Sequence, residues 1–272
     1  MKIKKLVVYT WVVLLVILYV SPLMWLFSSS LKSDSTYTKD QFTIRALLPT
    51  EFRLNNYLYV LEKGNLGRAV LNTLYVTSLN ILGCGFLNSL AAFALAYLRF
   101  PGKKFLMTLV IAMIIIPGDS LLLQNFITIK NLGLVNSYAA LVIPGLGNAF
   151  FIYLFRQFFL NIPKDIFDSA RMDGASLWQI YLKIAVPISK PVFIATSIFI
   201  FNGMWNAFLW PLIVITNPKY QVIQVSVQRF LGSRTLDVGY VMAALSISAI
   251  PPLIVFLLLQ RYFVEGLRGM GR

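Results

Sequence analysis

The chain has 272 residues, of which 58% are hydrophobic and only 12% are charged, and its formal net charge is +14. An ordinary soluble domain is about one-quarter charged, so this composition excludes a typical soluble protein and indicates an integral membrane protein. The absence of histidine removes the commonest metal ligand and general base, and the single cysteine, Cys84, excludes a disulfide framework or a thiol metal cluster.

Six apolar stretches predict helices that cross a bilayer. They cover about residues 6–27, 70–98, 105–127, 138–159, 191–215 and 239–263. We interpret the first as an uncleaved anchor, because no small-residue cleavage pattern follows it. Pro117-Gly118, Pro144-Gly145 and Pro251-Pro252 should kink or break their helices. The expected fold is an all-α polytopic membrane protein with six transmembrane helices.

The basic residues predict how this protein is oriented. If the N-terminus lies inside, there are 14 Lys and Arg residues in the 58 positions of the inner segments 1–5, 99–104, 156–190 and 261–272. There are 10 in the 88 positions of the outer segments 28–68, 117–138 and 216–240. This bias places both termini in the cytoplasm. Because the cations flank apolar stretches, membrane orientation explains the net charge better than nucleic-acid binding. The first outer segment, 28–68, is expected to be a partly ordered extracellular loop.

A charged segment at residues 163–187, between the fourth and fifth stretches, predicts a helix–turn–helix. Pro163 suits a first helical position, and Gly174 suits the left-handed residue that ends a helix. Ser176 and Gln179 have the spacing of a capping box, and Pro187 should interrupt the second helix. Such a polar unit needs a partner. The alternative to docking on a partner is that the segment lies on the inner leaflet as an amphipathic loop. Its three aspartates disfavour this location, because an anionic membrane surface attracts Lys and Arg.

No source of energy for transport is visible in the chain itself. None of the ten acidic residues falls clearly within an apolar stretch, which argues against a proton-driven carrier, because such carriers keep ionisable groups there. Sodium coupling is less firmly excluded, since backbone carbonyls can bind the ion. The chain also lacks the G-x-x-x-x-G-K-[ST] phosphate-binding motif. If this protein pumps, a separate subunit must supply the energy, and the charged helix–turn–helix is where it would be received.

The charged segment resembles the cytoplasmic E-A-A…G…I-x-L-P loop of ABC importer permeases. The matching positions are Asp168, Ser169, Ala170, Gly174, Ile184 and Pro187. Asp168 replaces the usual Glu, Ser169 replaces Ala, and Val186 replaces Leu, but an acid, small residues and the turn glycine remain. Similarity to carbohydrate permeases of the maltose-transporter type extends to residues 156–159, 162–163, 205–212 and 260–267.

The resemblance implies the ABC importer type I permease fold in a prokaryotic cell membrane. An N-terminal anchor helix and extracellular loop would occupy residues 1–69, the permease core 70–263 with its coupling loop at 160–190, and a cytoplasmic tail 264–272. The implied partners are a second related permease, two ATPase subunits and an extracellular solute-binding protein. ATP and magnesium would be bound by the ATPase, while this chain would hold no cofactor or metal and would not be an enzyme.

By the same resemblance, the helix at 163–173 would be the coupling helix seated in a groove of one ATPase. The docking residues would be Asp165, Asp168, Ser169, Ala170, Asp173, Gly174, Ile184 and Pro187. The expected solute is an oligosaccharide or a related carbohydrate. A glycerol-phosphate-like or other non-sugar solute is an alternative, and a stand-alone ion-coupled carrier is a further one.

Amide and aromatic side chains recur along the fifth stretch. Asn202, Asn206 and Trp210 are spaced by four residues, and Trp205 lies beside them. Amides and aromatic rings bind sugars, so these residues could line a substrate path. Hydrogen bonding between helices and anchoring at the membrane interface are the alternatives, and we prefer these packing roles.

The last outer segment, 216–240, carries polar side chains that could meet another protein. They include Tyr220, Gln221, Gln224 and Gln228. In similar permeases the corresponding loop reaches toward the binding protein. The segment could equally be a solvated connector.

Overall fold

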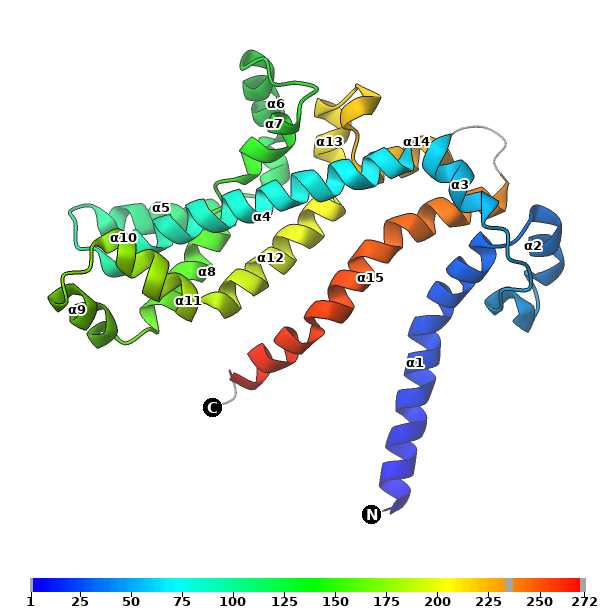
Figure 1. Ribbon diagram of the computed structural model, residues 1–272, viewed down its shortest axis with the longest axis horizontal. Helices are drawn as coiled ribbons and strands as arrows, with labels where there is room; N and C mark the ends of the chain where they lie inside the picture. The colour runs from blue at the N-terminus through cyan, green and yellow to red at the C-terminus, as the bar shows by residue number, and fades with distance from the viewer. Residues whose placement is uncertain (1, 233–236, 270–272) are drawn as a thin grey trace. The chain divides into compact units, whose positions relative to one another are not determined.

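The computed structural model describes the backbone of residues 2–232 and 237–269, and the side chains of residues 5–258 apart from 6, 119 and 233–236. Every element assigned in these residues is helical, as predicted (Figure 1). The chain divides into two compact units. Unit 1 comprises Met1–Leu71 and Val222–Ile254, and unit 2 comprises Asn72–Gln221 and Val255–Arg272.

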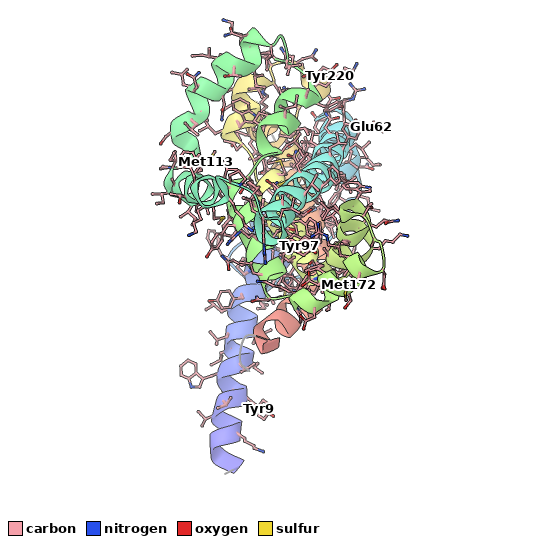
Figure 2. The ribbon with its side chains drawn as sticks, turned by 90° about the vertical axis from the view of Figure 1, so that its left-hand side faces the viewer. Tyr9, Glu62, Tyr97, Met113, Met172 and Tyr220 are labelled. Atoms are coloured by element: carbon pink, nitrogen blue, oxygen red, sulfur yellow. The ribbon has the colours of Figure 1, made fainter. Side chains whose placement is uncertain are left out.

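Unit 1 is built around a long N-terminal helix and two later helices. Its elements are α1 (Lys2–Ser30), α2 (Asp34–Asp40), η1 (Ile44–Leu47), α3 (Asn55–Glu62), the start of α4 (Leu66–Tyr97), α14 (Ile223–Leu231) and the first half of α15 (Val238–Gly269). The apolar side chains of α1 from Val7 to Val20 are exposed and project outward along the helix (Figure 2). An apolar surface of this length suits contact with lipid.

The segment that follows α1 is more ordered than the partly ordered loop that we predicted. The side chain of Asn56 donates hydrogen bonds to the carbonyls of Ser30 and Lys32 at 2.9 and 3.0 Å. The hydroxyls of Ser30 and Tyr57 lie 2.6 Å apart. A side chain at Gly239 would collide with the Lys32 carbonyl, so this glycine lets α15 approach the turn after α1. Buried backbone polar groups therefore have specific partners here.

Unit 2 contains the remaining elements. They are the rest of α4, α5 (Lys103–Ile115), η2 (Gly118–Leu121), α6 (Leu122–Asn131), α7 (Tyr138–Val142), η3 (Ile143–Gly145), α8 (Ala149–Leu160), α9 (Lys164–Met172), α10 (Leu177–Ile180), the π-helical η4 (Tyr181–Ala185), α11 (Val186–Ile188), α12 (Lys190–Trp205), α13 (Leu209–Val214) and η5 (Pro218–Tyr220). Helices α5 and α12 both pack on α8. The core is rich in aromatic side chains, including Phe93, Phe155, Phe159 and Tyr181.

Six continuous transmembrane helices are not observed in the described residues. Three helices are long and apolar enough to span a membrane: Val7–Ser30, Leu66–Tyr97 and Val238–Leu258. The number rises to five if each of two bent helix pairs counts as one span. These pairs are Tyr138–Gly145 with Ala149–Leu160, bent by 48°, and Leu177–Ile188 with Lys190–Trp205, bent by 75°. The six-span count is therefore not confirmed.

Proline positions account for part of this difference. The predicted helix at 105–127 is broken, because α5 ends at Ile115 and Pro117-Gly118 follows. Pro144 likewise lies at the break between α7 and α8. Pro251-Pro252, in contrast, lies inside α15 without interrupting it. The first two proline pairs therefore coincide with helix breaks, as predicted, whereas no break occurs at the third.

Candidate functional site

The charged segment folds as predicted into two helices joined by a tight turn. The first helix, α9, begins at Lys164, so Pro163 is its N-cap rather than its first helical residue. Phe167 is buried, whereas Asp165 and Asp168 are exposed. Helix α9 therefore presents a polar face to its surroundings and fixes itself to unit 2 through an apolar side chain.

Phe167 is the anchor of α9, and it enters an aromatic cluster. Its ring lies 5.0 Å from that of Tyr97 and 6.2 Å from that of Phe93, measured between centroids. Phe93 in turn lies 5.9 Å from Phe159 and 5.4 Å from Tyr181. Rings from α4, α8, α9 and the π-helical segment thus meet at one point, and each such pair is worth about 0.5–1.5 kcal/mol beyond area burial.

The turn after α9 is a Schellman motif. Gly174 has φ +81°, and its N–H donates to the carbonyl of Arg171 at 3.1 Å. The N–H of Ala175 donates to the carbonyl of Ala170 at 3.0 Å. Both alanines pack against the aromatic core. This pair of bonds satisfies carbonyls at the end of α9 and requires a residue that tolerates the left-handed conformation.

The second helix begins with the predicted capping box. The hydroxyl of Ser176 accepts from the N–H of Gln179 at 3.3 Å, and the side-chain oxygen of Gln179 accepts from the N–H of Ser176 at 2.8 Å. The hydroxyl of Tyr181 lies 2.7 Å from that of Ser89 on α4. These bonds fix the start of the second helix both locally and against the core.

Pro187 does not interrupt the second helix directly. The backbone widens into the π-helical turn Tyr181–Ala185 and continues to Ile188, before the 75° bend into α12. Proline has no N–H to give its i−4 carbonyl, and its ring crowds that carbonyl, so a widened preceding turn is a way to accommodate it. Ile184 is half-buried in this segment, and Pro187 is exposed.

The remaining predicted docking residues lie on the surface. Ser169, Asp173 and Gly174 are exposed, and Ala170 is half-buried. Asp165 lies in the first turn of α9, where a carboxylate complements the helix dipole. The structure therefore brings the predicted residues together on one helix–turn–helix, with acids outward and small residues at the turn.

The residues predicted for a substrate path separate into two groups. Asn202 and Asn206 are exposed, and the amide of Asn206 donates to the side-chain oxygen of Asn202 at 2.6 Å. Trp205 is fully buried, and its ring stacks on Phe201 at 5.6 Å. Trp210 is half-buried, and its indole N–H donates to the carbonyl of Ala140 at 3.0 Å. Both tryptophans therefore make packing contacts within unit 2, and the two asparagines are the more exposed members of the set.

The residues predicted to meet a binding protein also differ in exposure. In unit 2, Gln221 is buried, and Tyr220 is half-buried with its ring edge-on to Tyr138 at 5.0 Å. In unit 1, Gln224 donates to the hydroxyl of Ser248 at 3.3 Å, and Gln228 is exposed. Gln221 therefore has little exposed surface for such a contact, and Gln228 is the most accessible of the four.

Two cations that close the end of α4 were not predicted from the sequence. Lys103 donates through Nζ to the carbonyls of Ala96 and Leu98 at 3.0 and 2.8 Å. Arg156 donates through Nε to the carbonyl of Leu95 at 3.1 Å. Cations stabilise the carbonyl end of a helix. Lys103 could have been found from its place just after the helix, whereas Arg156 is 61 residues away from its partner.

These features define a multi-pass helical membrane protein with a charged helix–turn–helix that is anchored to its aromatic core. The chain belongs to the family of binding-protein-dependent transport system inner membrane components, which it matches over residues 88–269. The terminal motif at 260–267 lies within this match, although its side chains are outside the described residues. Family membership confirms the predicted resemblance.

Named relatives belong to sugar and glycerol-phosphate systems. The chain is 33% identical over 150 residues to the lactose transport system permease protein LacG of Rhizobium radiobacter, covering 55% of each chain. It is 38% identical over 141 residues to the sn-glycerol-3-phosphate transport system permease protein UgpE of Salmonella typhi, covering 51% of this chain and 50% of the relative. The chain thus aligns with about half the length of these curated relatives.

Two solved structures share the fold over nearly the whole chain. One chain of a bacterial ABC transporter involved in the import of the acidic polysaccharide alginate matches with a TM-score of 0.86 at 22% identity, covering 96% of this chain and 97% of that one. A chain of the bacterial alginate ABC transporter in complex with alginate pentasaccharide-bound periplasmic protein matches with a TM-score of 0.60 at 17% identity, covering 94% and 92%. At these identities the likeness shows the fold, and it confirms the predicted permease fold.

Proposed function

We propose that this chain is the transmembrane permease subunit of an ATP-driven importer that carries oligosaccharides or related carbohydrates into the cytoplasm. Family membership and the relatives named for lactose and alginate support this class of solute. The relative named for sn-glycerol-3-phosphate keeps a glycerol-phosphate-like solute as the second candidate. Competition of labelled lactose uptake by excess glycerol 3-phosphate, and the reverse, distinguishes the two.

The observation that carries this proposal is the mounting of α9. An aromatic anchor, a Schellman turn and a capping box hold a short helix in place while its carboxylates stay exposed. A rigid polar helix can transmit force from a protein that grips it, whereas a loosely attached helix would absorb the motion. We infer that α9 docks in a groove of a cytoplasmic ATPase, with contacts from Asp165, Asp168, Ser169, Ala170 and Asp173.

In this arrangement ATP and magnesium belong to the ATPase partner, and this chain binds neither and catalyses no reaction. A second related permease, two ATPase subunits and an extracellular binding protein complete the complex. One structural relative is a transporter in complex with a periplasmic protein, which supports a binding-protein partner. The Lys and Arg bias supports a cytoplasmic location for both termini.

Gly174 gives the sharpest test, because substitution there is restricted by the backbone conformation and not by lack of space for a side chain. A Cβ at this position would meet no atom within 4 Å, but φ is +81°. A β-branched residue is strongly disfavoured there, at a cost of at least about 1–2 kcal/mol, while asparagine tolerates the left-handed region. We expect Gly174→Val to abolish ATP-driven uptake and solute-stimulated ATP hydrolysis in the reconstituted complex, and Gly174→Asn to retain most of both.

Gly133 is a matched control elsewhere in unit 2. It also has positive φ, at +69°, no atom within 4 Å of a Cβ, and the same pair of Schellman bonds at the end of α6. Gly133→Val therefore carries the same backbone strain away from α9. If Gly174→Val transported solute at the wild-type rate, or if both valine variants failed equally while still assembling, the coupling role of α9 would be refuted.

A further inference from the structure

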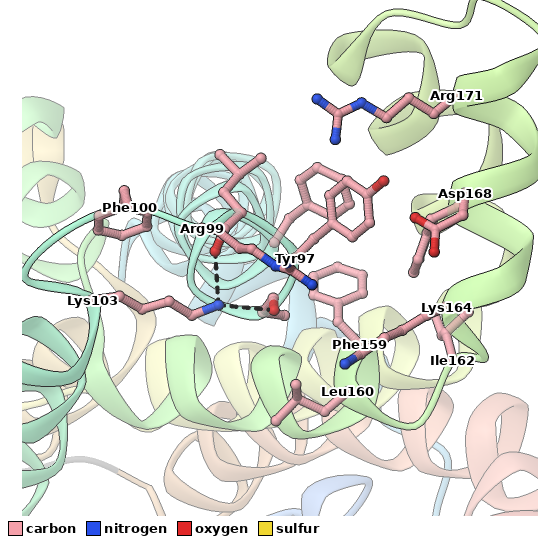
Figure 3. A pocket seen from close by; sticks show the side chains of 14 residues that line it. Tyr97, Arg99, Phe100, Lys103, Phe159, Leu160, Ile162, Lys164, Asp168 and Arg171 are labelled. Atoms are coloured by element: carbon pink, nitrogen blue, oxygen red, sulfur yellow. Dashed lines mark hydrogen bonds between the residues drawn. The ribbon is translucent and has the colours of Figure 1, made fainter.

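A basic pocket of about 630 Å³ lies in unit 2 where α4, α5, α8 and α9 meet (Figure 3). Aromatic side chains form part of its wall. Four cations and one carboxylate line it: Arg99, Lys103, Lys164, Arg171 and Asp168. Arg99 lies in the loop after α4, Lys103 is the first residue of α5, and Lys164 and Arg171 are the first and next-to-last residues of α9. No two of them are neighbours in sequence, so folding of the unit creates this concentration of charge.

The cations of the pocket are only partly neutralised. Lys103 is held by the two α4 carbonyls, but carbonyls do not remove its charge. In the part of the chain that the structure describes, Arg99, Lys164 and Arg171 form no ion pair. Figure 3 shows Lys103 and Arg99 extending into the pocket from one side and Lys164 and Arg171 from the other. A bound anion would reduce the repulsion among them.

The direction in which the pKa of Lys103 is shifted agrees with this repulsion. Burial lowers the pKa of Lys103, and the positive charges of Arg156, Lys164 and Arg99 lower it further. An anion bound among these cations would raise the pKa of Lys103 toward its ordinary value.

The pocket also lies at the end of an apolar surface. The candidate span Leu66–Tyr97 ends two residues before Arg99. Helix α5 begins at Lys103 and exposes Phe105, Leu106 and Leu109 in its next turns. Cations at the end of an exposed apolar helix match the two parts of a phospholipid. The phosphate lies at the membrane interface, next to the cations, and the acyl chains lie along the apolar helix.

We propose that this pocket binds the phosphate headgroup of an anionic phospholipid whose acyl chains lie against α5. An acidic protein segment would find the same cations, but it would gain nothing from the adjoining exposed apolar face. The inference depends on the membrane location that the family establishes and not on the proposed transport of a carbohydrate. Loss of lipid binding and loss of transport can therefore be measured separately.

Native mass spectrometry of the full chain, released from detergent with phosphatidylglycerol or phosphatidylcholine, tests the proposal. Removing two cations with Lys164→Gln and Arg171→Gln together should weaken phosphatidylglycerol binding by about thirtyfold, at roughly 1 kcal/mol per charge. Both side chains are exposed and unpaired, and glutamine is a good helix former, so α9 should remain folded. The control is Lys104→Gln with Lys183→Gln, which removes two exposed lysines that do not line the pocket.

A second measurement uses the unchanged protein. Phosphatidylglycerol should protect Lys103 from acetylation, whereas its neighbour Lys104, outside the pocket, should react as before. Inorganic phosphate and a polyglutamate peptide serve as separate probes. The proposal is supported if only the anionic lipid protects Lys103 and the double variant abolishes that protection. It is overturned if phosphatidylcholine protects equally, if phosphate or the peptide protects in place of the lipid, or if the double variant binds lipid as the wild type does.

Discussion

At the scale of single residues, Lys32 shows how a charge can be used for folding. It follows α1 and is 1% exposed, and its Nζ lies 3.1 Å from Oδ2 of Asp40 and 2.7 Å from the Arg45 carbonyl. Thr50 donates a further hydrogen bond to Asp40. A buried ammonium needs such partners, because leaving it unpaired is strongly unfavourable. Lys32 therefore fixes the segment after α1 in addition to adding charge at the membrane edge.

Asp40 should make the stability of unit 1 depend on pH. The hydrogen bond from Thr50, aided by Lys32, holds the pKa of Asp40 below its ordinary value. A carboxylate whose pKa is lowered by folding stabilises fully above its unfolded pKa, about 3.9, and this contribution is lost as pH falls through the folded pKa. We expect the melting temperature to fall below about pH 4 and Asp40→Asn to flatten that fall.

The same variant should also melt at a lower temperature at pH 7, because Lys32 loses its counter-charge. Glu62→Gln is the control, since Glu62 is exposed and forms no ion pair among the described residues. Glu51 adds to the wild-type fall, because the Ser33 N–H lowers the pKa of Glu51. Equal melting curves for Asp40→Asn and wild type from pH 7 to acid would contradict the assigned role of the pair.

At the scale of elements, local signals predicted the site better than its surroundings. The capping box and the Gly174 turn were both expected, because each depends on residues within five positions of one another. The anchoring of Phe167 was not expected, since its ring partners Phe93 and Tyr97 lie about 70 positions away on α4. The split between α12 and α13 was also not predicted, because residues 191–215 form one apolar stretch, although Gly203 and Pro211 lie on either side of the break.

The capping box allows a test of how much local order the site needs. Ser176→Ala removes the hydroxyl that accepts from Gln179 and should cost about 1 kcal/mol. Because α10 has only four residues, we expect fraying of α10 to extend to α9, the helix proposed to dock on the ATPase. Solute-stimulated ATP hydrolysis should then fall several-fold. Ser137→Ala removes the matching cap of α7, so it should cost similar stability with little loss of hydrolysis. Equal loss in the two variants would mean that stability alone limits activity.

At the scale of the whole molecule, composition predicted the class of protein, and family membership bears it out. The number of spans was harder to predict. Hydropathy reports the length of an apolar stretch, but not whether that stretch forms one straight helix. Residues 138–159 appear as one stretch, yet a 48° bend divides it. Residues 177–205 include a 75° bend that begins in the charged segment itself. Bends of this kind are set by packing against other helices, which hydropathy does not report.

At the same scale, the positions of the acidic residues bear on how transport by this chain would be energised. None of the ten acidic residues lies in any candidate span, straight or bent, and these spans fall within the described part of the chain. A proton-coupled carrier would keep such groups in its spans as a relay. We therefore expect the purified chain, alone in vesicles, not to accumulate solute against a gradient under an imposed proton or sodium gradient. Uptake should appear only when the cognate ATPase, second permease and binding protein are added with ATP. Concentrative uptake by the chain alone would show that it carries its own coupling site, and the dependence on α9 would then have to be abandoned.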